Sequence, residues 1–159
     1  MVAAQCWSGG ARNVNEGIKT MDTLGKLIDE FLAAQAFAVV GASEDPNKYG
    51  HMCYASLINR GMNAYPVNPR AKMILDNPVY PNIAALPEKV QSLSIITPPQ
   101  VTEKVIDEAI AAGIKNVWMQ PGAESPSAIR KAQKAGMNVI AEGPCLLVEL
   151  AKQPRKSRL

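Results

Sequence analysis

The run Phe37-Ala-Val-Val-Gly-Ala-Ser43 constrains the fold of this chain more than any other stretch. It is almost wholly apolar and stops at a glycine, which is typical of a strand buried on both faces. A polar, turn-like segment follows at residues 43–49. An apolar-periodic segment then covers residues 50–60, and a second apolar run lies at 63–67. This order predicts a strand, a glycine turn, a helix and a strand, the opening unit of nucleotide-binding α/β folds.

The same alternation continues to the end of the chain. Three more apolar runs, each followed by proline or glycine, predict strands at 92–97, 115–120 and 137–141. Helical periodicity is found over 21–34, 101–110 and 125–135, with a final turn at 146–151, and residues 71–87 are expected to form a loop with one short helical turn. We predict an α/β fold, a Rossmann-like three-layer α/β/α sandwich around a mostly parallel five-stranded sheet.

Length and composition favour a single folded domain. The 159 residues, 47% of them hydrophobic, fit one domain at 21–151, between a flexible leader at 1–20 and a basic tail at 152–159. No apolar stretch approaches the roughly 18 residues of a membrane span. A net charge of +3 and only 5% aromatic residues argue against a nucleic-acid surface. We expect a small-molecule ligand, with no nucleic acid and no membrane as partner, and a homodimer is plausible.

The cysteine and histidine content argues against a metal centre. Cys6, Cys53 and Cys145 are widely spaced, and His51 is the only histidine, so no cluster has the spacing of a zinc site. Reduced thiols are typical of intracellular proteins, which favours a cytoplasmic location. The final triplet Ser157-Arg158-Leu159 resembles a peroxisomal address and leaves that organelle as an alternative. A mitochondrial transit peptide at the N-terminus is less well supported.

Polar residues and helix breakers gather at the ends of four predicted strands. These ends are Gly41-Ala-Ser43, Asn68-Pro-Arg70, Thr97-Pro-Pro99 and Gln120-Pro-Gly122. Right-handed crossovers bring the carboxyl ends of parallel strands to one edge, where open α/β sheets bind their ligands. We therefore expect the ligand site at this edge.

The residues at this edge do not match an NAD site. The fingerprint GxGxxG is absent, because Gly41 is followed by Ala42 and Ser43. The acidic residue that holds a ribose hydroxyl is replaced by Arg70, with Lys72 close behind. Cations there favour a phosphate on the ribose, as in NADP or coenzyme A, although both side chains could also be ordinary solvated loop residues.

Six motifs in order resemble the small stand-alone coenzyme A-binding proteins, which are similar to the N-terminal CoA-binding domain of the succinyl-CoA synthetase α subunit. The likeness covers about residues 35–149. Its motifs are Val39-Val-Gly-Ala-Ser43, Lys48-Tyr-Gly50, Pro66-Val-Asn-Pro-Arg70, Ile95-Ile-Thr-Pro-Pro99, Trp118-Met-Gln-Pro-Gly122 and the region of Cys145.

The resemblance implies CoA laid across the strand ends. It places the pyrophosphate at Gly41, Ala42 and Ser43 and the loop to Lys48, Tyr49 and Gly50. It places the adenosine and its 3′-phosphate at Asn68 and Arg70, and the adenine and pantetheine side at Thr97, Pro98 and Pro99, with Gln120 completing the predicted cofactor-binding set. The synthetase's phosphohistidine and grasp domains have no counterpart in this sequence, so a ligase reaction by this chain alone is not expected.

Three functions remain open from the sequence. The first is a protein that binds CoA or an acyl-CoA without catalysis, because no catalytic set of residues is recognisable. The second is a small NADP-dependent oxidoreductase, and the third is a nucleotide-sensing regulatory module. His51 is expected to be a helix-start residue that touches solvent or ligand. Cys145 is expected to be an inert thiol, or one that forms a mixed disulfide with CoA.

Overall fold

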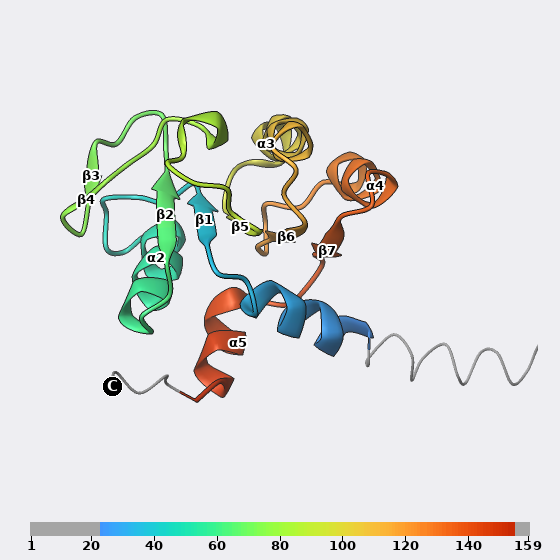
Figure 1. The fold of residues 1–159 in the computed structure, drawn as a ribbon, viewed down its shortest axis with the longest axis horizontal. Coiled ribbons are helices and arrows are strands. Elements are labelled where there is room, and N and C mark those ends of the chain that lie inside the picture. The colour runs from blue at the N-terminus through green and yellow to red at the C-terminus, as the bar shows by residue number, and fades with distance from the viewer. Residues whose placement is uncertain (1–22, 155–159) are drawn as a thin grey trace, which may run out of the picture.

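The computed structural model describes residues 23–154, and its centre is a five-stranded sheet (Figure 1). The strand order is β2-β1-β5-β6-β7, and all four neighbouring pairs are parallel. The strands are β1 (Phe37–Val40), β2 (Ala64–Val67), β5 (Ser92–Ile95), β6 (Asn116–Met119) and β7 (Asn138–Ile140). This arrangement confirms the predicted Rossmann-like α/β fold.

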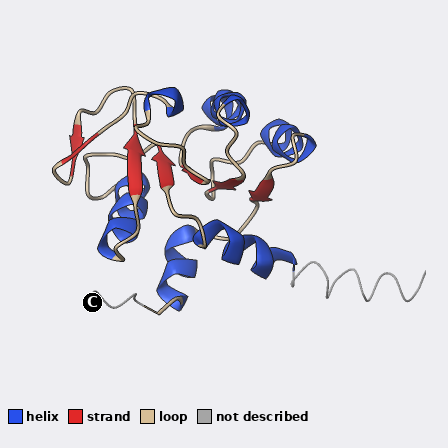
Figure 2. Cartoon of the chain, in the orientation of Figure 1, coloured by secondary structure: helices blue, strands red, loops and turns tan. Residues whose placement is uncertain are grey.

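Helices cover both faces of the sheet (Figure 2). One face carries the helix over residues 23–32 together with α2 (Tyr49–Asn59) and α5 (Leu146–Lys152). The other carries the short 3-10 helix η1 (Ile83–Ala85), α3 (Pro99–Ala111) and α4 (Pro126–Lys134).

Strand β1 shows why the sheet needs two helical layers. All four of its residues are buried, and they alternate between two separate cores. Phe37 and Val39 belong to the core beneath α2 and α5, whereas Ala38 and Val40 belong to the core beneath α3 and α4. Successive side chains of a strand point to opposite faces, so an all-apolar run requires cover on both sides.

The strand order creates a topological switch point between β1 and β5. From β1 the chain passes outward to β2 in one direction, and it later returns to the other side of β1 as β5. The connections leaving β1 and β5 therefore diverge to opposite faces and leave a crevice at the carboxyl edge. This crevice is bordered by the loops that precede α2 and α3.

The segment after β2 contains an element that the sequence pattern does not predict. The expected loop over residues 71–87 has its helical turn, which η1 confirms. The same stretch also contains an antiparallel ribbon of β3 (Met73–Ile74) and β4 (Asn77–Pro78). Its two-residue turn, Leu75 and Asp76, has positive φ at both positions. This conformation suits the twist of a hairpin but is unusual for leucine, which is why the sequence pattern does not indicate it.

The predicted leader and most of the predicted basic tail, including the Ser157-Arg158-Leu159 triplet, lie outside the described residues. Among the helices of residues 23–154, none is long and apolar enough to cross a membrane.

Candidate ligand site at the carboxyl edge

The end of β1 and the start of α2 approach each other so closely that only glycine fits. Gly41 has a φ of +91°, and a Cβ on it would lie 1.9 Å from the Ile96 carbonyl oxygen. A Cβ on Gly50 would lie 2.0 Å from the Gly41 carbonyl oxygen. The two glycines therefore bring main chain against main chain at the switch point. A side chain at either position would force these two segments apart.

The loop between these glycines ends in a helix terminus suited to an anion. Lys48 is the residue that precedes α2; its side chain makes no capping bond, and the first turn of the helix contains no acidic residue. The first N–H groups of such a helix are available, and its dipole favours negative charge. The loop itself is ordered by hydrogen bonds from the Asp45 amide to Ser43 Oγ (3.1 Å) and from the Asn47 amide to Asp45 Oδ1 (3.0 Å).

His51 ties the loop to the helix. Its Nδ1 lies 2.8 Å from the carbonyl oxygen of Ser43. A carbonyl oxygen only accepts, so Nδ1 carries the proton in this contact. The side chain is half-buried. This places the only histidine where it supports the loop conformation.

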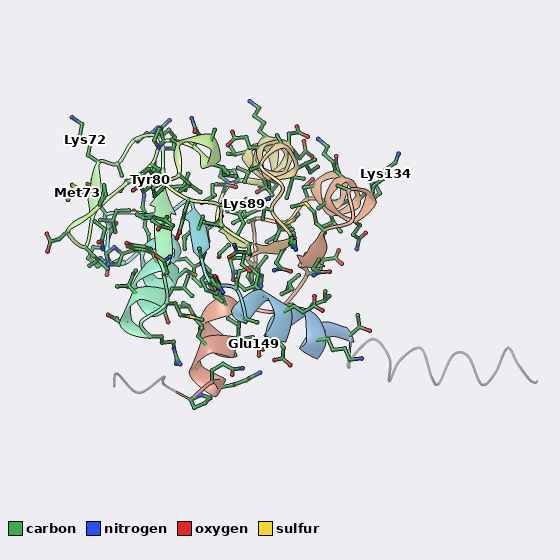
Figure 3. The ribbon with its side chains drawn as sticks, in the orientation of Figure 1. Lys72, Met73, Tyr80, Lys89, Lys134 and Glu149 are labelled. Atoms are coloured by element: carbon green, nitrogen blue, oxygen red, sulfur yellow. The ribbon has the colours of Figure 1, made fainter. Side chains whose placement is uncertain are left out.

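The end of β2 combines a structural amide with free cations. Asn68 donates from Nδ2 to the Ala42 carbonyl oxygen (2.7 Å), and its Oδ1 accepts from the Arg70 amide (2.9 Å). The two strand ends are therefore joined. Arg70 and Lys72 are exposed, and within residues 23–154 neither forms an ion pair. Figure 3 shows Lys72 pointing away from the body of the protein.

The end of β5 presents two prolines at the start of α3. Pro98 and Pro99 are exposed, and Pro99 is the first residue of the helix, where its missing N–H costs nothing. Thr97 is half-buried, and its Oγ1 lies 2.8 Å from Oγ1 of Thr102. Thr102 also donates back to the carbonyl oxygens of Thr97 and Pro98. The prolines form a rigid apolar surface. The hydroxyl and the carbonyl oxygen of Thr97 are both bonded to Thr102.

Gln120 lies inside the protein rather than on its surface. Its exposed fraction is 0%, and both ends of its amide are bonded within the fold. Nε2 donates to Ser94 Oγ (3.2 Å), while Oε1 accepts from the Leu146 amide (2.9 Å) and the Tyr49 hydroxyl (3.2 Å). Both ends of the Gln120 amide are therefore occupied by partners within the fold. It joins β6 to the first residues of α2 and α5.

Tyr49 extends this network to Cys145, a contact that the sequence does not predict. The Tyr49 hydroxyl contacts Cys145 Sγ and donates to Gln120. With that proton committed to Gln120, the thiol is the group left to donate. Burial, and next the hydrogen bond to Cys145, raise the pKa of Tyr49 well above its ordinary value. The hydroxyl thus stays protonated and keeps the start of α2 fixed to the end of β6.

Cys53 lies close to the same hydroxyl but is suited to packing. It is fully buried in the core beneath α2. Burial raises the pKa of the Cys53 thiol to about 12, although a hydrogen bond with Tyr49 lowers it. The thiol is therefore protonated at neutral pH and a poor nucleophile. Residues 23–154 contain no cluster of three or more histidine, cysteine or acidic side chains that could hold a metal ion.

Replacing Gln120 with alanine is expected to lower the free energy of unfolding by about 2–3 kcal/mol. The change leaves a buried amide N–H and two hydroxyls without their partner. Tyr49→Phe removes only one of these bonds and is expected to cost about 1 kcal/mol. Denaturant unfolding of both variants measures the difference. Equal losses would contradict a central role for the Gln120 amide.

A family model and a curated relative both match most of this chain. A family model described as a CoA binding domain matches residues 35–151. An ADP-forming acetate–CoA ligase of Archaeoglobus fulgidus is 29% identical over 120 residues, which cover 69% of this chain but 17% of the ligase.

Two solved structures cover most of both chains. A conserved hypothetical protein of Pyrococcus furiosus is 38% identical with a TM-score of 0.68, covering 72% of this chain and 98% of its own. A hypothetical protein of Pyrococcus horikoshii is 27% identical with a TM-score of 0.76, covering 81% and 90%. With the family model matching most of its length, this chain belongs to the CoA binding domain family.

Proposed function

We propose that this protein binds coenzyme A or an acyl-CoA at the carboxyl edge of its sheet, without catalysis of its own. The observation that carries the proposal is the close backbone contact between Gly41 and Gly50 beside the start of α2, where the side chain of the N-cap residue makes no hydrogen bond. A helix start of this kind matches the needs of a pyrophosphate, which binds to N–H groups at a helix N-terminus. Gly41, Ala42, Ser43 and the loop to Lys48 are the residues proposed to contact it.

The two sides of this loop suit the two ends of CoA. On the β2 side, the unpaired cations Arg70 and Lys72 are proposed to hold the ribose phosphate of the adenosine end. On the β5 side, Pro98 and Pro99 offer apolar surface to the pantetheine arm. Asn68, Tyr49 and Gln120 are proposed to position the loop, because their side chains bond to other parts of the protein.

The activity of the ligases is not proposed for this chain. It spans 17–27% of the length of the first two curated relatives that it matches. The exposed cations and prolines at the carboxyl edge support a binding role, and the Cys145 thiol is in contact with the Tyr49 hydroxyl. A binding or carrier role, or a module that senses CoA for a partner, fits these residues better than ligation.

Calorimetric titration tests the proposal. Purified protein is titrated in parallel with CoA, dephospho-CoA, NADPH and NADH. We expect saturable binding of CoA, with dephospho-CoA about tenfold weaker, a difference of about 1.4 kcal/mol. If NADPH binds and CoA does not, the ligand is NADP rather than CoA, and this result favours an NADP-dependent oxidoreductase. Absence of binding by all four would refute a nucleotide site in the isolated protein.

Arg70→Ala is expected to remove the preference for CoA over dephospho-CoA. The exposed guanidinium has no carboxylate partner within residues 23–154, so its loss affects the ligand phosphate rather than the fold. Affinity for CoA should fall about tenfold, while affinity for dephospho-CoA stays the same. Arg130→Ala, an exposed arginine on α4, is the matched control and should change neither. If the Arg70→Ala variant still prefers CoA to dephospho-CoA, a group other than Arg70 holds the ribose phosphate.

A further inference from the structure

We propose that Glu124 accepts a hydrogen bond from an N–H or O–H group on the pantetheine arm of the ligand, and so selects CoA by its uncharged part. The inference rests on the proposed function and deepens it. Its starting observation is that Glu124 Oε2 is buried and has no hydrogen-bond partner among the described residues. Buried polar atoms are nearly always bonded, so an orphaned carboxylate oxygen calls for a missing donor.

The neighbouring groups of the same turn do not supply that donor. Glu124 lies in the turn between β6 and α4, where its other oxygen, Oε1, accepts from the Gly122 amide at 3.2 Å. The Ala123 amide donates to the Gln120 carbonyl oxygen at 2.8 Å. The hydroxyl of Ser125 donates to Glu103 Oε1 at 2.8 Å. These donors are thus committed to other acceptors, and no ion pair within residues 23–154 involves Glu124.

The position of this turn identifies the part of the ligand that it would meet. The turn follows β6, which lies next to β5 and two strands from β1. With the ribose phosphate at Arg70 beyond β2 and the pyrophosphate at the end of β1, the remaining arm runs toward β5 and β6. Neighbouring strands are about 4.8 Å apart, so β6 lies roughly 15 Å from β2, within reach of an extended CoA molecule.

The charge of Glu124 also excludes the phosphates as its partner. A carboxylate repels phosphate and accepts from neutral donors, and hydrogen bonds to a charged acceptor are stronger than neutral ones. The pantetheine arm carries two amide N–H groups and a hydroxyl, and these are its donors apart from the thiol. A ligand with this arm satisfies the orphaned oxygen, whereas a ligand that ends at the pyrophosphate does not.

The test compares two probes in one set of titrations. CoA contains the arm, and adenosine 3′,5′-bisphosphate lacks it. Glu124→Ala is expected to weaken CoA binding about tenfold or more and to leave binding of the bisphosphate unchanged. Glu124→Gln keeps an acceptor oxygen without the charge and should lose less, which retains a test if the alanine variant does not fold. Glu108→Ala, which removes an exposed carboxylate in the last turn of α3, is the charge-matched control.

Each result separates this inference from the function on which it rests. Wild-type protein that binds neither probe overturns the proposed function and the role of Glu124 together. Wild-type binding of CoA with unchanged affinity in both Glu124 variants overturns the inference alone. An equal loss for CoA and the bisphosphate also overturns it, because Glu124 would then act by holding the turn. A loss confined to CoA, absent in Glu108→Ala, supports it.

Discussion

Replacing Gly50 with alanine is expected to lower the free energy of unfolding by about 3 kcal/mol and to weaken CoA binding in the same variant. The added Cβ would lie 2.0 Å from the Gly41 carbonyl oxygen and 3.3 Å from the Cα of Ala42. Both are backbone atoms, so neither can rotate aside, and α2 has to shift away from β1. Denaturant unfolding measures the first effect, and calorimetric titration with CoA measures the second.

Two other glycines serve as controls, because they separate the effect of a steric clash from the effect of a positive φ. Gly25 lies in the helix over residues 23–32 with nothing within 4 Å of an added Cβ, so Gly25→Ala should stabilise by about 0.5–1 kcal/mol. Gly61 has equally open surroundings but a φ of +75°, so Gly61→Ala should cost about 1 kcal/mol. A Gly50 variant no worse than the Gly61 variant would show that close packing is not what requires glycine there.

Trp118→Ala is expected to lower the free energy of unfolding by about 3–5 kcal/mol, at least as much as Gly50→Ala. Trp118 is fully buried in β6 and packs edge-to-face on Phe31, with ring centroids 5.2 Å apart. Its Nε1 donates to the Pro144 carbonyl oxygen at 2.9 Å. Truncation therefore creates a cavity between β6 and the helix over residues 23–32. It also frees the segment that leads into α5.

Trp118→Phe separates the contribution of the hydrogen bond to Pro144 from that of the packed ring. The phenyl ring retains most of the packing and removes the N–H donor, so a cost of about 1–2 kcal/mol is expected. Denaturant midpoints of the two variants, compared at equal slope, give the difference. If phenylalanine proves as destabilising as alanine, the bond to Pro144 rather than the filled volume holds this part of the core.

The layers of the fold could be predicted because each central strand has a clear local pattern. The runs at β1, β5 and β6 are buried along their whole length and end at glycine or proline, which leaves few alternatives to a covered parallel sheet. Ser125 followed by Pro126 likewise predicted the start of α4. The structure shows Ser125 Oγ accepting from the Ala128 amide. These signals are local, and so a single sequence carries them.

The direction of polar side chains could not be predicted in the same way. Gln120 follows β6 at the carboxyl edge of the sheet and is predicted from the sequence to contact the ligand; the structure adds that its amide is bonded to Ser94 and Leu146 inside the protein. Nothing in the sequence distinguishes it from Glu124, in the turn that follows, whose carboxylate has an unused oxygen. The difference depends on contacts between residues far apart in the chain, which spacing does not encode.

Tyr80, which follows the ribbon of β3 and β4, pairs with the outer side of β2. β2 is one of the two outer strands of the sheet, and an uncovered outer strand invites other chains to add to it. Here the Tyr80 amide donates to the Pro66 carbonyl oxygen, and the Asn68 amide donates to the Tyr80 carbonyl oxygen. Pro66 also has no N–H to offer. The segment that sequence patterns indicated as loop thus shields this edge of the sheet from strand-to-strand aggregation.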